Sequence, residues 1–466
     1  MKLKCLPLFV LSIWALLFSW MFAGLVTADE SSPNIVFIFA DDWGWGDLGC
    51  HGHPYLKTPN LDRLAQEGTE YYQFTVASGV CSPSRAAVIT GHFPARHSIH
   101  GHFATVESHQ QRGMPDWLDP EIVLLPRLLK SAGYATAHYG KWHLTNIMVP
   151  DAPRPDRYGY DKYGVFNCSG EQMPVHDDVE NSIAFIEQSV KSKTPFFLNL
   201  WIHEPHTPHY PKKKYLQQFA HLENEADRIY AAVLAHADAR IGQLLETLEE
   251  LNVTGDTLVI FSSDNGPEYT GPPSRRMTDD RSTGPGFGTF ASVGTTGGHR
   301  GQKRSLLQGG VGVPFIVRWP EKVAAGKIDD VTPITAVDLL PTFCEAAGVS
   351  LPADYHPDGV SQLSVWQGKT TPNGERKPPI LWDWRFASPR RPHWPEKAVR
   401  SGDWKLVVGR NGNPTELFRF PEDRLEQHDL SERHPEVVTN LKRMFSEWQA
   451  TLPKSPNPDC FSKTRN

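Results

Sequence analysis

The sequence has few cysteines and no marked excess of charge of either sign. Only 6 of the 466 residues are cysteine, which excludes a disulfide-dense secreted scaffold. The formal net charge is -6, which argues against a nucleic-acid partner. No internal repeat or low-complexity tract is visible, and 39% hydrophobic residues exclude a disordered, collagenous or polytopic membrane protein. At this length we expect one large α/β domain with a smaller satellite.

One long apolar run is present, at the N-terminus. Lys2 and Lys4 precede an apolar stretch over residues 6–26, and small residues follow it up to Ala28. This pattern is typical of a secretory signal that is cleaved after Ala28. Because the stretch is also long enough to span a bilayer, an uncleaved N-terminal membrane anchor is the alternative. In both cases we expect an exported protein, either periplasmic, extracellular or lumenal.

Apolar runs that alternate with helical patterns indicate a layered α/β fold. The segments 34–40 and 257–262 are continuous and rich in β-branched and aromatic residues, which is typical of strands buried on both faces of a mostly parallel sheet. We expect helices over 60–67, 124–132, 224–251 and 435–449, and a further strand over 404–408. After about residue 372 the composition changes, and Trp, Arg and Pro become frequent. We therefore predict a signal peptide, a large domain and a C-terminal α+β subdomain, with the bounds 1–28, 29–372 and 373–466.

Oxygen-bearing side chains follow both predicted central strands. Asp41 and Asp42 come after the first strand, and Asp264 and Asn265 come after the second. In open α/β sheets, sites form beyond the carboxyl ends of the strands. Three carboxylates and an amide oxygen suit Ca²⁺ or Mg²⁺ better than zinc. Taken singly, both pairs are also common in helix caps and turns, so it is their shared place at one sheet edge that favours a metal site.

The segment 79–91 carries a second set of chemically active residues. It contains Cys81, Pro83 and Arg85 in the spacing Cys-x-Pro-x-Arg, followed by Thr-Gly. An isolated cysteine of an exported protein would ordinarily form a disulfide. This motif instead resembles the signature of the type I sulfatases, among them the arylsulfatases and N-acetylgalactosamine-6-sulfatases, in which the cysteine is oxidised to Cα-formylglycine. The resemblance implies an alkaline-phosphatase-like sandwich, with a large mostly parallel sheet between helices and a smaller C-terminal α+β subdomain.

Four further stretches carry the resemblance, which covers about residues 33–449. Residues 34–46 resemble the family's first metal-binding loop, and 133–143 resemble its second signature, with Tyr139 where a small or aliphatic residue is usual. Residues 204–208 and 300–314 resemble the segments with the active-site His and the last active-site Lys. In the last stretch, Gln308 and Gly312 replace the common Glu and Arg. We expect these departures to affect substrate preference more than catalysis.

The resemblance implies one Ca²⁺ ion and a set of catalytic residues. The expected metal ligands are Asp41, Asp42, the modified Cys81, Asp264 and Asn265. The expected catalytic residues are Cys81, Arg85, Lys141, His143, His206 and Lys303. A formylglycine-generating or anaerobic sulfatase-maturating enzyme is the implied maturation partner.

Each catalytic residue has an expected role in cleaving a sulfate ester. Formylglycine would attack sulfur while Arg85 holds it, and the two lysines would neutralise sulfate oxygens. His206 with Lys303 would protonate the leaving oxygen, and His143 would act as the base. On an extended segment, Lys141 and His143 would share one face. Four other histidines are left open between pocket and ordinary loop roles, namely His97, His100, His102 and His203.

Substrate hints come from two cationic segments. The Gly-rich stretch 267–304 contains Arg275, Arg276 and Arg281, and the stretch 382–394 combines tryptophans with arginines such as Arg390 and Arg391. Such groups suit a sulfated glycan or another sulfate ester. A Trp-rich subdomain packed on the main sheet is the alternative for the second stretch. The competing functions are a phosphomonoester or phosphodiester hydrolase of the same superfamily and a non-catalytic binder of sulfated glycans.

Overall fold

The computed structural model describes residues 32–270, 291–369, 376–385 and 394–465, together with the backbone at 278–279 and 288–289. Residues 33–466 form one compact unit. The predicted signal peptide lies outside the described residues. Among the residues that the structure describes, no helix has the length and apolarity needed to cross a membrane.

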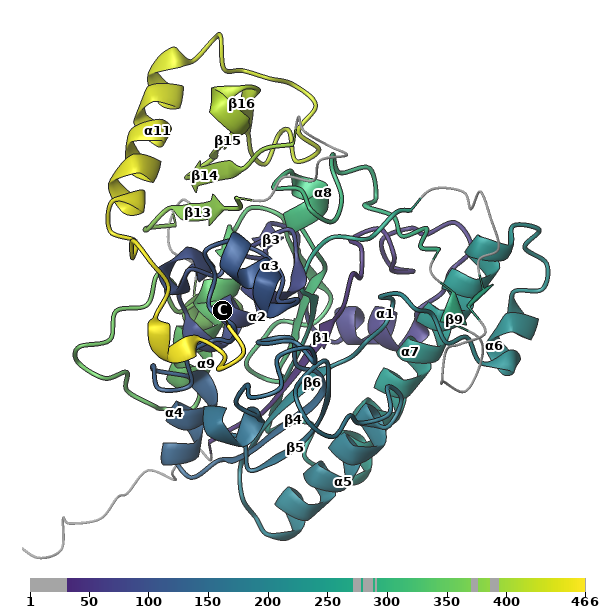
Figure 1. Ribbon diagram of the computed structural model, residues 1–466. Helices are drawn as coiled ribbons and strands as arrows, with labels where there is room; N and C mark the ends of the chain where they lie inside the picture. Colours follow the sequence, from purple (N-terminus) through teal and green to yellow (C-terminus); the bar gives the residue numbers. More distant parts are fainter. Residues whose placement is uncertain are drawn as a thin grey trace, which may run out of the picture. The chain divides into compact units, whose positions relative to one another are not determined.

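An eight-stranded, mostly parallel sheet forms the centre of this unit (Figure 1). Its strand order is β11-β2-β10-β7-β1-β6-β4-β5. Strand β10 runs antiparallel to both of its neighbours, β7 and β2. The strands are β1 (Asn34–Ala40), β2 (Thr69–Tyr71), β4 (Ala135–Lys141), β5 (Lys162–Phe166), β6 (Phe196–Trp201), β7 (Thr257–Ser263), β10 (Phe315–Arg318) and β11 (Lys327–Asp329). Both predicted central strands are confirmed as β1 and β7, which pair in parallel.

Helices cover both faces of the sheet. One face packs against α1 (Pro59–Gln66), α5 (Asp178–Lys191) and α7 (Glu225–Glu250), and the other packs against α2 (Cys81–Thr90), α4 (Leu125–Ser131) and α9 (Leu339–Ala346). Alternate residues of β1 enter the two cores, with Val36 in one and Phe37 in the other. This explains why the strand is apolar throughout. The helices predicted near α1, α4 and α7 are confirmed to within two residues at each end.

Short elements complete the large domain. They are β3 (Phe74–Thr75), α3 (Val106–Gln111), α6 (Lys213–Gln218), β8 (Thr278–Asp279), β9 (Gly288–Thr289), α8 (Gln308–Val311), β12 (Ile334–Thr335) and α10 (Leu363–Trp366), with short 3₁₀ turns between them.

A four-stranded antiparallel sheet and one helix form the C-terminal subdomain. The elements are β13 (Ile380–Asp383), β14 (Lys397–Ser401), β15 (Trp404–Val408), β16 (Thr415–Arg419) and α11 (Pro435–Gln449). The predicted strand 404–408 and helix 435–449 are therefore confirmed. α11 packs against β14 and β15.

The tryptophans of this region are core residues. Trp382, Trp384 and Trp394 are buried, and the indole N–H of Trp382 donates to the carbonyl oxygen of Val76 at 2.8 Å. All three rings therefore belong to the hydrophobic core, as the packing alternative predicts. The expectation that these tryptophans contact a sulfated glycan is wrong. The cations Arg275, Arg276, Arg281, Arg390 and Arg391 lie outside the described residues.

A buried ion pair inside the C-terminal subdomain yields a stability prediction. Lys405 Nζ lies 2.6 Å from Glu426 Oε1, and both side chains are buried. Lys405→Met would leave the Glu426 carboxylate without its cation, and we expect a loss of about 3 to 5 kcal/mol in the free energy of unfolding, measured with urea at pH 7. Arg443→Met, which breaks the exposed Arg443–Glu447 pair, should change little. Equal losses in the two variants would contradict the prediction.

Candidate active site

The ends of β1 and β7 bring the predicted metal ligands together. Ala40 pairs with Ser263 in the sheet, so Asp41 and Asp264 leave neighbouring strands at the same edge. The backbone N–H of Asp42 donates to Asp264 Oδ1 at 3.2 Å, and Asn265 Nδ2 donates to Asp42 Oδ1 at 2.6 Å. Asp42 has a φ of +69°, a left-handed conformation that Asp tolerates better than most residues. The chain therefore turns at once after the strand, and all four side chains are buried.

Cys81 enters this cluster from the first turn of α2. Its Sγ lies 3.6 Å from Asp41 Oδ1 and 3.5 Å from Lys141 Nζ. Arg85 lies one helical turn further on, and its Nε and a terminal nitrogen donate to Asp264 Oδ2 at 2.9 and 2.6 Å. The Cys-x-Pro-x-Arg spacing thus places the thiol and the guanidinium on the same side of a buried helix, both facing the sheet edge.

Two lysines reach the aspartates from other segments. Lys141, the last residue of β4, forms a short ion pair with Asp41. Lys303 Nζ lies 2.5 Å from Asp42 Oδ2, and His206 Nε2 lies 3.9 Å from the same oxygen. Together with Arg85, the lysines supply three cations for the three carboxylates, so that the buried charges balance before any ion or substrate binds.

These pairings set the protonation states. Burial alone would raise the pKa of Asp41 and of Asp42, but the cations, above all Lys141 for Asp41 and Lys303 for Asp42, hold both values below the usual range. Burial and the neighbouring Asp41 charge raise the pKa of Asp264 to about 6 despite Arg85. Burial opposes the charge of Lys303, yet the Asp42 carboxylate raises its pKa. Lys303 is therefore protonated at neutral pH.

The unmodified thiol of Cys81 has low reactivity. Burial, followed by repulsion from Asp264, raises its pKa to about 12. Since the thiolate is the reactive form of cysteine, the side chain as encoded is a weak nucleophile and a weak metal ligand at neutral pH.

His143 lies beside Lys141 in a different orientation from the one predicted. β4 ends at Lys141, and His143 has a φ of +54°, so the prediction that the two share one face of an extended segment is wrong. His143 Nε2 lies 3.0 Å from the carbonyl oxygen of Phe103, while its buried Nδ1 has no partner. An Nε2–H that donates to Phe103 leaves the Nδ1 lone pair free. Burial and Lys141 hold the pKa of His143 well below its usual value, which keeps the ring neutral.

The other histidines fall into two groups. His206 is held neutral by burial and by Lys303, which lower its pKa. The His203 ring lies 5.6 Å from that of His206, and the His102 ring lies 6.4 Å from that of His143, so both border the site. The His97 ring instead lies 5.4 Å from the His92 ring, and the Nδ1 atom of His100 is buried without a hydrogen-bond partner.

Three groups that support the site were not assigned to it from the sequence. The Phe103 carbonyl orients His143, and a backbone oxygen has no signal in the sequence. Glu268 Oε2 lies 2.5 Å from Arg304 and 3.9 Å from Lys303 Nζ. Both residues belong to the charged segment 267–304 of the sequence analysis. Glu268 comes three residues after Asn265 and Arg304 directly follows Lys303, and these positions are the signals that could have assigned them to the site.

The donor set fits a divalent cation. Asn265 Oδ1 is buried and has no hydrogen-bond partner, although its amide nitrogen is bonded to Asp42. Asp41, Asp42, Cys81 and His206 each offer one ligand atom, all within 4.8 Å of one another. Carboxylate and amide oxygens are the ligands that Ca²⁺ prefers. Added to a cluster whose charges already balance, such an ion would make the site net positive and attract an anion.

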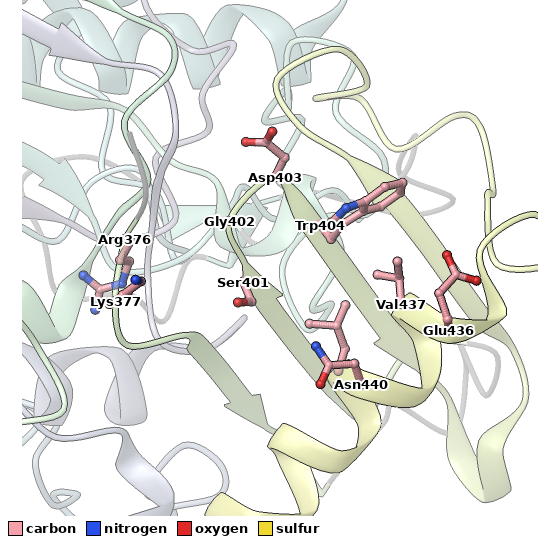
Figure 2. Close-up of a pocket in the computed structure, with 10 residues that line it drawn as sticks. Arg376, Lys377, Ser401, Gly402, Asp403, Trp404, Glu436, Val437 and Asn440 are labelled. Atoms are coloured by element: carbon pink, nitrogen blue, oxygen red, sulfur yellow. The ribbon is translucent and has the colours of Figure 1, made fainter. Parts of the chain in front are cut away.

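A separate cavity of about 590 Å³ lies in the C-terminal subdomain (Figure 2). Trp404, Val437 and Glu436 border it on one side, and Arg376 and Lys377 lie across from them. No predicted site residue lines this cavity, and acidic and basic groups share its walls. The predicted site residues therefore lie at the sheet edge and not around this cavity.

Comparison with known proteins shows the family to which the chain belongs. Residues 33–349 match the family model described as Sulfatase, and residues 298–451 match the one described as N-sulphoglucosamine sulphohydrolase, C-terminal. The N-acetylgalactosamine-6-sulfatase of Sus scrofa is 31% identical over 402 residues, which cover 77% of this chain and 71% of that protein. The N-acetylgalactosamine-6-O-sulfatase of Bacteroides thetaiotaomicron is 25% identical and covers 90% of this chain and 93% of its own length.

A solved structure extends the similarity to the fold. The crystal structure of Ps i-CgsB in complex with k-i-k-neocarrahexaose superposes with a TM-score of 0.74 at 26% identity, over 93% of this chain and 96% of that one. The fold is thus that of a sulfatase, with the expected large sheet and C-terminal subdomain. The chain belongs to the type I sulfatase family and is a sulfuric ester hydrolase.

Proposed function

We propose that the chain hydrolyses sulfate esters of carbohydrates at the β1–β7 edge, after Cys81 has been converted to formylglycine and with one Ca²⁺ bound. The observation that carries the proposal is the position of Cys81, buried between Asp41 and Lys141. The ion would be held by Asp41, Asp42, Asp264, Asn265 and the modified residue 81. Hydrated formylglycine supplies an oxygen nucleophile for sulfur, and Ca²⁺ supplies positive charge beside it.

The chain's own residues bind the sulfate and manage protons. Arg85 fixes Asp264 and thereby one wall of the metal site. Lys141 and Lys303 neutralise the sulfate oxygens, because both ammonium groups are buried beside the position of residue 81. Lys303 Nζ and His206 both approach Asp42, and together they deliver a proton to the leaving oxygen. The free Nδ1 of the neutral His143 accepts the proton that completes the cycle.

The proposal includes a maturation partner and export. A formylglycine-generating or anaerobic sulfatase-maturating enzyme would supply the oxidation of the Cys81 side chain, with loss of its sulfur. The N-terminal pattern of residues 1–28 supports export, by a cleaved signal or a retained anchor.

The carbohydrate class is supported by the named relatives. Two of them are N-acetylgalactosamine-6-sulfatases, and the similar solved structure holds k-i-k-neocarrahexaose. In this chain Arg304 is a partly exposed cation next to Lys303, with its side chain 41% exposed. It shares the carboxylate of Glu268 with Lys303, which lies 3.9 Å from the same oxygen, so we expect it to reach substrate groups around the sulfate.

A substrate comparison tests this assignment. An oligosaccharide ending in N-acetylgalactosamine 6-sulfate should exceed a nitrophenyl sulfate in kcat/KM, because binding energy from remote groups can be used in the chemical step. Arg304→Ala should reduce kcat/KM for the oligosaccharide by about 10-fold and for the aryl ester much less. Arg410→Ala, at an exposed arginine paired with Glu396, is the control and should change neither. If the aryl ester is the better substrate across a panel of sulfated glycans, the carbohydrate assignment is wrong and sulfatase chemistry remains.

A further inference from the structure

A second cluster of side chains that can bind a metal consists of His176, Glu204 and His236, near the loop that carries His206. His176 comes from the segment before α5, Glu204 from the segment after β6, and His236 from α7. Each offers one ligand atom, and the three atoms lie within 4.8 Å of one another. The two imidazole rings are nearly perpendicular, with centroids 4.8 Å apart. The fold thus brings two histidines and a carboxylate from three separate elements to one point.

Two buried polar atoms of this cluster have no hydrogen-bond partner, which indicates that the cluster binds an ion. Glu204 Oε1 is approached by His176 Nε2 at 3.0 Å and by Arg240 at 3.3 Å, while the second oxygen, Oε2, is buried without a partner. His176 Nδ1 is also buried without a partner. The Glu204 side chain is only 2% exposed, so an unsatisfied carboxylate oxygen there is energetically costly. A cation bound to Glu204 Oε2 would remove this cost.

The nearby arginine does not occupy the position of the cation. Arg240 forms an ion pair with the buried Asp178, so its charge is compensated outside the cluster. Its contact with Glu204 is through Oε1, which leaves Oε2 free. A cavity of about 470 Å³, lined by His176 and Tyr210 among others, gives solvent a route to this region.

We propose that His176, Glu204 and His236 bind a zinc-type transition-metal ion. Two imidazoles and a carboxylate are a set that Zn²⁺ uses, with a fourth position left for water, whereas Ca²⁺ prefers oxygen ligands throughout. The ion would stabilise the active-site loop, because Glu204 precedes His206 by two residues and its carbonyl accepts from the N–H of Asp41 at 3.3 Å. This site is distinct from the proposed Ca²⁺ site and does not depend on the proposed function.

The test is a Co²⁺ titration of the full chain, with Zn²⁺ as competitor. Ca²⁺ is kept saturating so that the oxygen-rich site is filled. We expect one equivalent of Co²⁺ with the visible absorption of a tetrahedral site, its displacement by one equivalent of Zn²⁺, and a higher Tm with either ion. His176→Ala and His236→Gln should each lose the absorption.

Two control variants separate this site from other binding. His221→Ala removes an exposed histidine, and Cys50→Ser removes the thiol of the Cys50–His51–Glu70 group, which is a further possible metal cluster. Both should bind Co²⁺ as the unaltered chain does. Circular dichroism melts of every variant check folding, and His236→Gln keeps a helix-forming polar residue in α7. Absence of a bound equivalent, unchanged binding in both site variants, or loss of binding in either control would overturn the proposal.

Discussion

Cys81→Ala is expected to lower sulfatase turnover by about 10³-fold or more, because it removes the group from which the nucleophile is made. Cys81→Ser should behave in the same way in a host that cannot oxidise serine. Both changes are small and lie in a site whose other charges remain paired, so the variants should fold with an unchanged circular dichroism spectrum. The measurement is kcat with a sulfate ester, together with a mass spectrum of the peptide that contains residue 81.

The matched control for this prediction is Cys50→Ser. Cys50 is exposed and lies outside the active-site cluster, so its loss should leave turnover unchanged. The mass spectrum of the unaltered protein should show the aldehyde, which is lighter than the thiol. Comparable turnover by either Cys81 variant, or full activity with an intact thiol at position 81, would disprove the proposed chemistry.

Removal of Ca²⁺ with a chelator is expected to lower turnover by about 10²-fold or more, with recovery on addition of Ca²⁺. Without the ion, the buried carboxylates remain paired with Arg85, Lys141 and Lys303, so the cations that should hold the sulfate are engaged elsewhere. Asp42→Ala should lower Ca²⁺ occupancy and turnover together. The control is Asp256→Ala. Asp256 is exposed and directly precedes β7, at the end of the strand away from the site, so its loss should change neither Ca²⁺ occupancy nor turnover.

Element analysis distinguishes the sulfatase from the phosphoester hydrolase of the same superfamily. It is best done in the His176→Ala background, because the second site proposed above would otherwise contribute zinc. One calcium per chain supports the sulfatase assignment. Two zinc ions per chain in that background would support a phosphoester hydrolase and contradict the Ca²⁺ site.

The sequence by itself determined the central strands, several helices and the set of candidate active-site residues. A strand buried on both faces must be apolar throughout, which made β1 and β7 visible, and parallel neighbours end at one edge, which placed Asp41 near Asp264. The amphipathic patterns of α7 and α11 were readable for the same reason, since one face of each is buried. The resemblance of the Cys-x-Pro-x-Arg motif to the sulfatase signature associated Cys81 with Arg85, and the structure places both on α2.

Only the tertiary structure decided how the residues are paired and oriented. That Lys141 meets Asp41 while Lys303 meets Asp42 depends on strand order and loop conformation, and neither has a local periodicity. His143 turns away from the face of Lys141 because the strand ends and φ becomes positive, and its partner is a backbone carbonyl that any residue could supply. The tryptophans near residue 382 had a composition suited to sugar binding, but burial against Val76 makes them core residues. The His176–Glu204–His236 cluster was invisible in the sequence, because its members are joined only by the packing of three separate segments.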